Sequence, residues 1–596
     1  MPERISPERA QTIVRQFRRY EEYFAERGID RRQFLRMIAA GSAAATVIPV
    51  LVACGQVTEQ EATEATTPTP SPAPAQTPVA GTQPTPAPQP TPTAPAGPPR
   101  GGTIVIGTLG EAQTINPLLT NESEGQWRAR MLFDEFLKLD LQTLEPVPNI
   151  AKQWTVDGQT TYTFTLQDGI TFSDGTPLTA EDIAFTLHAI LKKETASPFV
   201  PRFIGIQGAQ EYNQGQADTI SGIQVVDERT IKITLKEPNA AFLANLRFLR
   251  PLPKRHLEGK SLTDDPFFQQ PIGAGPFIFK SWNIGGDFVA ERNPNYWQQG
   301  LPYLDGFTHR TIADSQSLVI ALETGDIEAS MYAQPTLAEQ LRAREHLVVL
   351  VRPSGVDING WNFGQKTVEA LGDARVRRAI AMAIDVDRFA SDFLLGLGKP
   401  ATGPVPAGHW AFKQGLQRIP YDPQAARQLI EEAGVTGLRV RLTANAGNKF
   451  REDWVTFTQQ ALAQIGVEGV PDLKEWTQVV QEGTNGTFEL ICPTFAGMLI
   501  DPDELYLALH SQSPRNVSGY SNPEMDRLLE EGRRTLDIEK RKEIYGRVQE
   551  LVQQDVPVFY AWDRPFINVV TKDFAGYVNT VLAFFERLEE WYRVSG

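Results

Sequence analysis

From residue 101 onward, the apolar and polar positions alternate with both strand and helix periods. Residues 101–107 form a short apolar run opened by glycines, which predicts a strand. Residues 162–166 alternate with period two before a Gln-Asp-Gly turn and predict a second strand. Residues 127–137 carry apolar side chains at helical spacing. Since strands and helices mix without a strict βαβ rhythm, the pattern predicts an α/β fold.

Two local signals fix element ends in this region. Thr179-Ala-Glu-Asp182 resembles a capping box and predicts a helix over 183–191. The apolar runs 223–226 and 230–235 flank an Asp-Glu turn and predict a hairpin.

The first 54 residues show a different pattern from the body of the chain. Residues 37–53 form an apolar stretch of mostly small residues that ends at Cys54 and follows the pair Arg31 and Arg32. The stretch is shorter than the roughly 20 residues of a membrane span and fits the core of an export signal. Because the arginine pair resembles a twin-arginine export motif and Leu-Val-Ala-Cys resembles a lipobox, we expect 1–53 to be a lipoprotein signal. A single transmembrane anchor is the alternative.

Lipidation of Cys54 predicts where the protein works. Acyl chains contribute about 0.8 kcal/mol per buried methylene, enough to hold a protein at a bilayer without spanning it. We therefore expect an extracytoplasmic protein that is lipid-anchored to the outer face of the cytoplasmic membrane, or one that is periplasmic.

Residues 54–100 are compositionally unlike the rest of the chain. Thirteen of the 44 prolines lie between Pro68 and Pro99, and the segment lacks aromatic residues. Such a segment cannot bury enough apolar surface to order itself and favours extended polyproline II. We expect a disordered tether there and a packed body from 101 to the end.

Charge and composition exclude several function classes. The formal net charge is −15, although residues 1–53 alone carry nine arginines and six acids. A body with this much negative charge lacks the basic face that a protein needs to bind the phosphates of a nucleic acid. Two cysteines cannot support a disulfide framework or a thiolate zinc site, and the six histidines show no ligand spacing. We expect no metal and no cofactor. Hydrolase and nucleotide motifs are also missing, so an exported enzyme is a weak alternative.

Four ordered blocks carry a family resemblance. They resemble the signature blocks of the family 5 solute-binding proteins of peptide-type ABC importers. The blocks include Phe172-Ser-Asp-Gly-Thr-Pro-Leu-Thr-Ala-Glu-Asp182, Gly273-Ala-Gly-Pro-Phe277, Asp373-Ala-Arg-Val-Arg-Arg-Ala-Ile380 and Gly519-Tyr-Ser-Asn-Pro-Glu-Met-Asp526. Most of these residues also have structural roles: we expect Asp373 to cap a helix whose Arg375, Arg377 and Arg378 form a solvated face, and Tyr296 and Trp297 to be packed.

The resemblance implies a two-lobed periplasmic-binding-protein fold of type II, cluster C-like, with an extra domain on the first lobe. Hinge closure would enclose the ligand. The implied segments are lobe I at 101–140, 259–355 and 559–596, an accessory domain at 141–258, and lobe II at 356–558.

The resemblance also implies candidate ligand contacts. Asn121 or Ser123 would lie at the cleft edge, Tyr332 would follow the family's Gly-acid-Ile-acid segment, and Phe495 would stand where an aromatic wall residue often stands. Trp361 would lie near the lobe junction, and Trp562 is a further aromatic candidate, although packing is the competing role for each tryptophan.

One departure from the family affects the choice of ligand. Peptide-binding members place an aspartate for the ligand's α-ammonium three residues before an acid-proline pair, and here that position is Met498, before Asp501-Pro502. Burying an ammonium without a carboxylate partner is unfavourable. A peptide with a free N-terminus is therefore disfavoured unless Asp501 or Glu504 substitutes, and methionine suits an apolar or mixed ligand.

The resemblance implies a monomeric binding component of an ABC importer, and the missing catalytic motifs disfavour an enzyme. Its partners would be permease subunits and ATPases, a small-molecule or oligomeric solute such as a peptide, and the bilayer through acylated Cys54. An extracytoplasmic sensor that works without a transporter is the main alternative.

Overall fold

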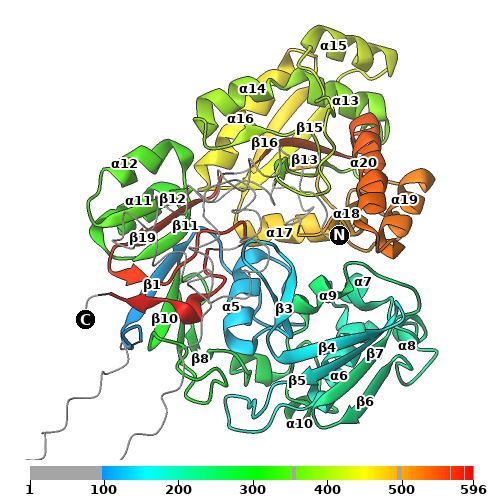
Figure 1. Cartoon of the computed structure of the whole chain (residues 1–596). Coiled ribbons are helices and arrows are strands. Elements are labelled where there is room, and N and C mark those ends of the chain that lie inside the picture. The colour runs from blue at the N-terminus through cyan, green and yellow to red at the C-terminus, as the bar shows by residue number, and fades with distance from the viewer. Residues whose placement is uncertain (1–96, 352–357, 493–499, 564, 583, 595–596) are drawn as a thin grey trace, which may run out of the picture. The chain divides into compact units, whose positions relative to one another are not determined.

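The computed structural model describes residues 97–594 apart from 352–357, 493–499, 564 and 583 (Figure 1). The predicted export motif Arg31 and Arg32, the lipidation site Cys54 and the tether up to residue 96 lie outside the described residues. Phe495, Met498 and the side chain of Tyr332 also lie outside the described part of the structure.

The first lobe is built on a seven-stranded sheet drawn from three distant parts of the chain. Its central strand β1 runs parallel to both neighbours, β10 and β11, whereas the outer pairs are antiparallel. In spatial order the strands are β12 (Leu347–Val351), β19 (Ile567–Thr571), β11 (Ala329–Ala333), β1 (Thr103–Thr108), β10 (Gly306–Thr311), β9 (Asp287–Arg292) and β8 (Phe277–Trp282). Helices α11 (Ser315–Thr324) and α12 (Ala338–Arg342) pack on β11 and β12. The predicted strand at 101–107 is confirmed as β1.

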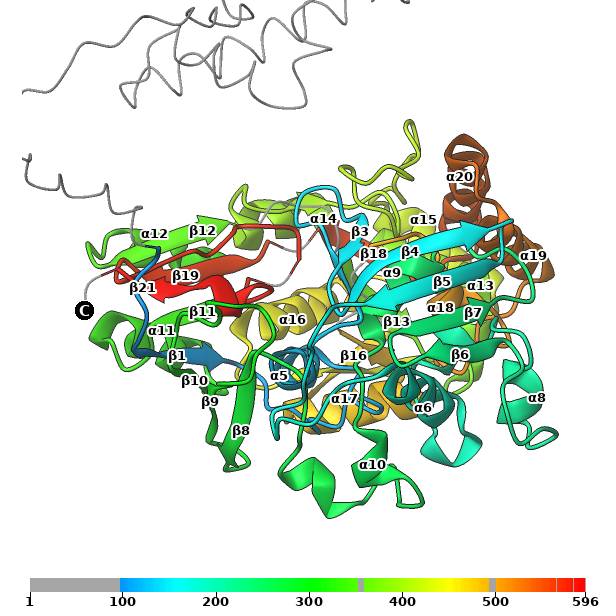
Figure 2. The ribbon, with the colours of Figure 1, turned by 60° about the horizontal axis from the view of Figure 1, so that its bottom comes forward.

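A four-stranded antiparallel sheet forms the accessory domain (Figure 2). Its strands are β4 (Ala151–Asp157), β5 (Thr161–Leu166), β7 (Thr230–Thr234) and β6 (Ile223–Asp227). Helix α6 (Ala180–Leu191) packs on β6 and β7, and the short helices α7 (Val200–Phe203), α8 (Ala209–Asn213), α9 (Phe242–Asn245) and α10 (Lys254–Leu257) surround them. One continuous hydrophobic core joins this domain to the first lobe, because Phe164 and Leu187 belong to the same cluster as Ile104 and Phe307.

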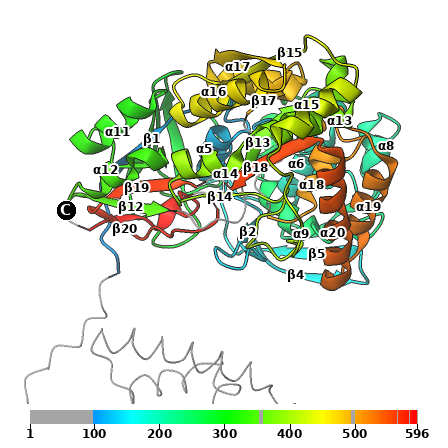
Figure 3. The ribbon, with the colours of Figure 1, turned by 90° about the horizontal axis from the view of Figure 1, so that it is seen from above.

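The second lobe has a six-stranded sheet with helices on both faces (Figure 3). Its strands are β14 (Lys399–Pro400), β18 (Val558–Asp563), β13 (Ile358–Phe363), β17 (Leu490–Ile491), β15 (Arg439–Asn445) and β16 (Glu468–Lys474). Side chains of β18 alternate between two cores, with Phe559 and Ala561 on one side and Val558 and Tyr560 on the other.

The helices of the second lobe divide between these two faces. One core holds α13 (Ala374–Ala383), α14 (Val386–Phe389), α15 (Pro423–Glu432) and α16 (Lys449–Ala463), and the other holds α18 (Glu504–Leu509), α19 (Pro523–Arg534) and α20 (Ile538–Asp555). Because both faces are covered, all six residues of β13 and of β18 are buried.

The chain passes between the two sheets twice, after Val351 and after Asp563. The predicted return to lobe I at residue 559 is therefore wrong by several residues. The sequence of a largely apolar strand does not indicate which sheet the strand joins. Pairing of Val558–Asp563 with β13 places this strand in the sheet of the second lobe.

Local signals predicted several element ends well. The Thr179 main-chain N–H and hydroxyl donate to Asp182 Oδ2 at 2.8 and 3.0 Å, which confirms the capping box. The hairpin forms as β6 and β7, and Tyr296 is buried as expected. The helix predicted at 127–137 is α5 (Ser123–Phe133), which begins and ends four residues earlier. The Glu122 carboxyl group caps its start by accepting the Gly125 N–H at 2.7 Å, and Asp134, with φ of +59°, ends it.

One prediction about α13 is wrong. Asp373 does cap this helix, accepting the Arg375 N–H at 2.8 Å. Arg377, however, is only 3% exposed and donates to the main-chain carbonyls of four residues instead of facing solvent. The acceptors are Leu371, Gly372, Asp555 and Val556. A helical arginine pattern cannot reveal acceptors that come from the far end of α20.

No helix within the described residues combines the length and apolarity that a membrane crossing requires.

Candidate functional site

The loop between β1 and α5 in the first lobe faces the second lobe. Gln113 Nε2 donates to the Thr477 carbonyl of α17 (Trp476–Asn485) at 3.3 Å. A Cβ atom on Gly110 would lie 2.9 Å from Cδ1 of Trp476, so only glycine allows this approach. The guanidinium of Arg451 lies 5.0 Å from the centroid of that indole ring, on the opposite lobe from Gly110. This loop therefore contacts the second lobe directly.

Asn121 and Ser123 lie at the N-terminus of α5, with Asn121 partly covered and Ser123 exposed. Between them, Glu122 is buried beside Glu124. Burial, followed by the charge of Glu124, raises the pKa of Glu122 to about 8. No sequence motif marks this pair of acids, which lie at the start of α5.

A second contact joins the lobes at the loop before α16. The carbonyl of Gly447 accepts hydrogen bonds from the Ser315 N–H at 3.1 Å and from the Ser315 hydroxyl at 3.0 Å. Gln334 then donates to Ser315 Oγ at 2.9 Å. Gly447 has φ of +77°, and a Cβ there would lie 2.1 Å from the Ala313 carbonyl oxygen.

A small cavity of about 20 Å³ lies beside this contact, large enough for a single water molecule. Residues from both lobes line it, among them Gln334 from the first and Asn359, Arg451 and Trp562 from the second. Trp562 is otherwise enclosed in the core, with Trp454 edge-on at 4.3 Å between ring centroids.

The acids that follow the 493–499 segment are all paired with arginines. Asp501 accepts from Arg541 at 2.6 and 3.0 Å, and Asp503 accepts from Arg533 at 2.8 and 2.9 Å. Glu504 receives two hydrogen bonds from Arg202 of the accessory domain, at 2.6 and 2.9 Å. Both oxygens of each carboxylate are thus occupied.

These pairs bear on the prediction that Asp501 or Glu504 replaces the acid missing at Met498. In this structure each is held by an arginine fork, which offsets the negative charge that would attract a ligand ammonium. Asp501 therefore ties α20 to the loop before α18. Sequence alone could not show this, since the partners lie 40 and 302 residues away.

Comparison with known proteins decides what kind of protein has this architecture. Residues 145–516, more than half of the chain, match the model of the bacterial extracellular solute-binding proteins, family 5 middle. The chain belongs to this family.

Curated relatives cover most of the chain. Protein XP55 of Streptomyces lividans is 29% identical over 493 residues, which are 76% of this chain and 82% of that protein. The oligopeptide-binding protein AppA of Bacillus subtilis is 25% identical over 529 residues, 83% of this chain and 92% of that protein.

Solved structures share the fold. AppA from Bacillus subtilis in complex with a nonapeptide has a TM-score of 0.77 at 24% identity, covering 84% of this chain and 100% of that one. The ABC transporter-associated periplasmic binding protein DppA from Helicobacter pylori, with the peptide STSA, has a TM-score of 0.75 at 24% identity and covers 83% and 99%. NikZ from Campylobacter jejuni with Ni(L-His) has a TM-score of 0.73 at 22% identity and covers 82% and 99%. The two-lobed α/β fold of a solute-binding protein is thereby established.

The chain is thus a solute-binding protein of a family of binding proteins rather than enzymes. Within the part of the chain that the structure describes, no three His, Cys, Asp or Glu side chains gather to hold a metal ion. The family's signature residues here serve packing: a Cβ on Gly273 would lie 2.1 Å from the Leu132 carbonyl, and Asn522 caps α19.

Trp361 occupies a core position in this solute-binding protein. Its side chain has no exposed surface, its indole N–H donates to Thr458 Oγ1 at 3.0 Å, and it stacks on Trp454. Ligand contact by Trp361, like that by Asn121, Ser123 and Tyr332, stays a prediction.

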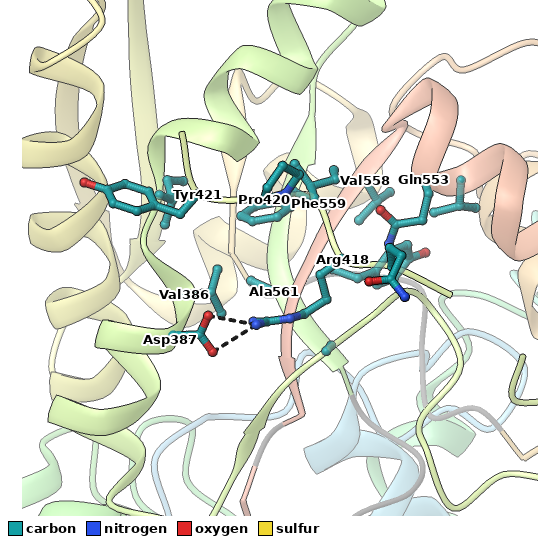
Figure 4. Close-up of a pocket in the computed structure, with 15 residues that line it drawn as sticks. Val386, Asp387, Arg418, Pro420, Tyr421, Gln553, Val558, Phe559 and Ala561 are labelled. Atoms are coloured by element: carbon teal, nitrogen blue, oxygen red, sulfur yellow. Dashed lines mark hydrogen bonds and ion pairs between the residues drawn. The ribbon is translucent and has the colours of Figure 1, made fainter. Parts of the chain in front are cut away.

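A larger cavity of about 230 Å³ is lined by residues of the second lobe (Figure 4). Its apolar lining includes Val558, Phe559 and Ala561 of β18, and the ion pair of Arg418 with Asp387 stands at its side, at 2.7 Å. No sequence pattern predicts this cavity, because its wall at 417–421 has no regular structure.

Proposed function

We propose that this solute-binding protein captures a peptide-like or other small solute between its lobes by hinge closure and delivers it to the permease and ATPase subunits of an ABC importer. The observation that carries the proposal is the meeting of both lobes around the loop that follows β1. Gly110 and Gln113 from one lobe contact Trp476 and Thr477 from the other. A site assembled from two lobes binds its ligand only when they approach each other.

The two passages between the sheets support a hinge. Among the described strands, only the connections after Val351 and after Asp563 join the two sheets through the chain. The accessory domain shares its core with the first lobe, so the second lobe is the part expected to rotate.

Membrane attachment is the second component of the proposal. Acylated Cys54 would anchor a monomer, and the proline-rich segment would space the body from the bilayer at about 3.1 Å per residue. Replacing Cys54 with Ala should release the protein from the membrane fraction. Replacing Arg31 and Arg32 together with Lys should block export, and normal surface levels of that variant would contradict the twin-arginine prediction.

The bound solute is best identified by mass spectrometry of what co-purifies with the full chain. An intact solute supports binding and delivery, whereas a chemically altered one would revive the enzyme alternative. Tyr332→Ala and Phe495→Ala should each weaken binding of that solute with little change in melting temperature. Unchanged affinity in both variants would move the site elsewhere.

A sensor is the remaining alternative, because a binding protein that serves a kinase needs the same closure. Uptake of the identified solute by cells that lack this protein distinguishes the two: loss of uptake supports import, and normal uptake supports sensing.

A further inference from the structure

His309 is a buried histidine of the first lobe to which the proposed function gives no role. It lies on β10, and its side chain has no exposed surface. Arg128 of α5 donates through Nε to the His309 Nδ1 atom at 2.9 Å. On the other side of the ring, the His309 Nε2 atom lies 2.7 Å from the hydroxyl oxygen of Thr108, the last residue of β1. Both ring nitrogens therefore have a partner in the protein.

These partners fix where the ring carries its proton. A guanidinium only donates, so the Nδ1 atom of His309 must offer a lone pair. The proton then lies on Nε2, which donates to the Thr108 oxygen, and the Thr108 hydroxyl donates in turn to the Gly110 carbonyl at 3.1 Å. Burial, followed by the charge of Arg128, lowers the pKa of His309 well below its ordinary value, in agreement with a neutral ring. The hydrogen bonds therefore run in one direction, from Arg128 to Gly110.

Arg128, the start of this hydrogen-bond chain, is held by several groups. Its guanidinium forms an ion pair with Glu111 at 2.7 Å. It also lies over one aromatic ring of β8 and one of β9, at 5.1 and 5.0 Å from their centroids. The other charged groups that act on it are Glu122 and Glu124, at the start of α5. Because these contacts fix the guanidinium, they also fix the orientation of the His309 ring.

The far end of the hydrogen-bond chain lies at the contact between the lobes. Gly110 approaches Trp476 of the second lobe so closely that a Cβ on Gly110 would lie 2.9 Å from Cδ1 of the indole. Three residues further on, Gln113 Nε2 donates to the Thr477 carbonyl at 3.3 Å. The loop that carries both contacts has no helix or strand between β1 and α5. Its position therefore depends on individual hydrogen bonds, such as the one that Thr108 donates to its main chain.

We propose that His309 is a positioning residue for lobe closure: its neutral ring, protonated on Nε2, orients the Thr108 hydroxyl, which holds the Gly110 carbonyl and so places the β1–α5 loop against the second lobe. The inference rests on the proposed function and deepens it by naming a residue that acts on closure from inside the first lobe. Without the hydrogen-bond chain, the loop would present Gly110 to Trp476 in more than one position, and the closed arrangement would lose a defined contact.

The ¹⁵N chemical shifts of the imidazole test the direction of the chain in the unmodified protein. The two tautomers of a neutral ring and the doubly protonated ring differ in these shifts. The His309 signals are identified by their loss in His309→Gln or, if that variant folds poorly, by replacing the other five histidines one at a time. We expect a proton on Nε2 only, from about pH 6 to about pH 8. A proton on Nδ1, or a second proton within this range, would overturn the proposal.

The position of the loop is measured from the opposite lobe. The full chain is labelled with 5-fluorotryptophan, and the ¹⁹F resonance of Trp476 is identified by its loss in Trp476→Phe. Thr108→Val removes the hydroxyl and should move or split this resonance, whereas Thr108→Ser keeps the hydroxyl and should leave it at the wild-type position. Thr186→Val is the matched control, because Thr186 of α6 is equally buried and donates to the Asp182 carbonyl at 2.7 Å. It should lower the melting temperature without moving the resonance.

Gly110→Ala separates failure of this inference from failure of the proposed function. Its Cβ would press on Trp476, so the resonance must move if the lobes meet in solution. If it moves in Gly110→Ala but not in a folded Thr108→Val, the hydrogen-bond chain serves stability only, and the inference is wrong while lobe closure stands. If it does not move in Gly110→Ala, the contact between the lobes is absent, and the proposed function loses its main support together with the inference. If Thr108→Val does not fold, the ¹⁵N result decides.

Discussion

Gly447→Ala should weaken solute binding without unfolding the protein. The added Cβ would lie 2.1 Å from the Ala313 carbonyl oxygen, well inside van der Waals contact, so the two loops must separate. Separation breaks the hydrogen bonds that the Ser315 N–H and hydroxyl donate to the Gly447 carbonyl, at 3.1 and 3.0 Å. Both bonds join one lobe to the other, so their loss disfavours the closed arrangement specifically.

The size of the effect follows from these two bonds. Each contributes about 1 kcal/mol net, so the closed arrangement loses about 2 kcal/mol. Because 1.4 kcal/mol corresponds to a factor of ten, affinity should fall by about 30-fold. The strain of alanine at φ of +77° is a separate cost that the open and closed arrangements share, so it lowers the melting temperature but cancels in the affinity.

A matched glycine separates these two costs. Gly434 in the second lobe has φ of +70° and nothing within 4 Å of its would-be Cβ, so Gly434→Ala carries the strain without the clash. Affinity for the co-purified solute is measured by calorimetry after the solute has been removed. We expect similar melting temperatures for the two variants and a loss of affinity only in Gly447→Ala. Equal affinities would refute the reasoning that this contact belongs to the closed arrangement.

Three further predictions concern the folded state. Arg377→Ala should lower the free energy of unfolding, measured in urea, by about 3 kcal/mol or more, since buried carbonyls lose their donors. Arg375→Ala on the same helix should unfold near the wild-type urea midpoint. Burial and Glu124 raise the pKa of Glu122 from its ordinary 4.5 to about 8, so between these pH values the folded protein keeps a proton that the unfolded chain releases. The stability contributed by this group is therefore complete below pH 4.5 and falls as the pH rises toward 8. Glu122→Gln should flatten that decline in thermal melts, and an unchanged pH profile would contradict the shift. Gly273→Ala should lower the melting temperature through its 2.1 Å approach to a main-chain oxygen of α5, and Gly205→Ala, with nothing nearby, should not.

Sequence patterns predicted those parts of the fold that depend on neighbours along the chain. The capping box at Thr179–Asp182 and the 223–235 hairpin are set by residues a few positions apart, and both form as expected. The position of β18 depends on pairing with β13, about 200 residues away, so the lobe boundary was misplaced. The burial of Arg377 likewise depends on carbonyls of the loop after α20.

The site was less predictable for the same reason. The position of Asp501 shortly after Met498 suggested a carboxylate for a ligand ammonium, but the chain brings in Arg541 from α20 as its partner.

The kind of contact between the lobes determines how closure can respond to solute. An extensive apolar interface would hold the lobes together whether or not a solute were present. Here the described contacts include hydrogen bonds such as Ser315 to Gly447 and Gln113 to Thr477, and the ion pair of Arg202 with Glu504, each modest in net free energy. Contacts of this size can be outweighed by the binding free energy of a solute that binds only the closed state, which then shifts the population. Polar contacts between the lobes are therefore suited to a protein that must both capture its solute and release it.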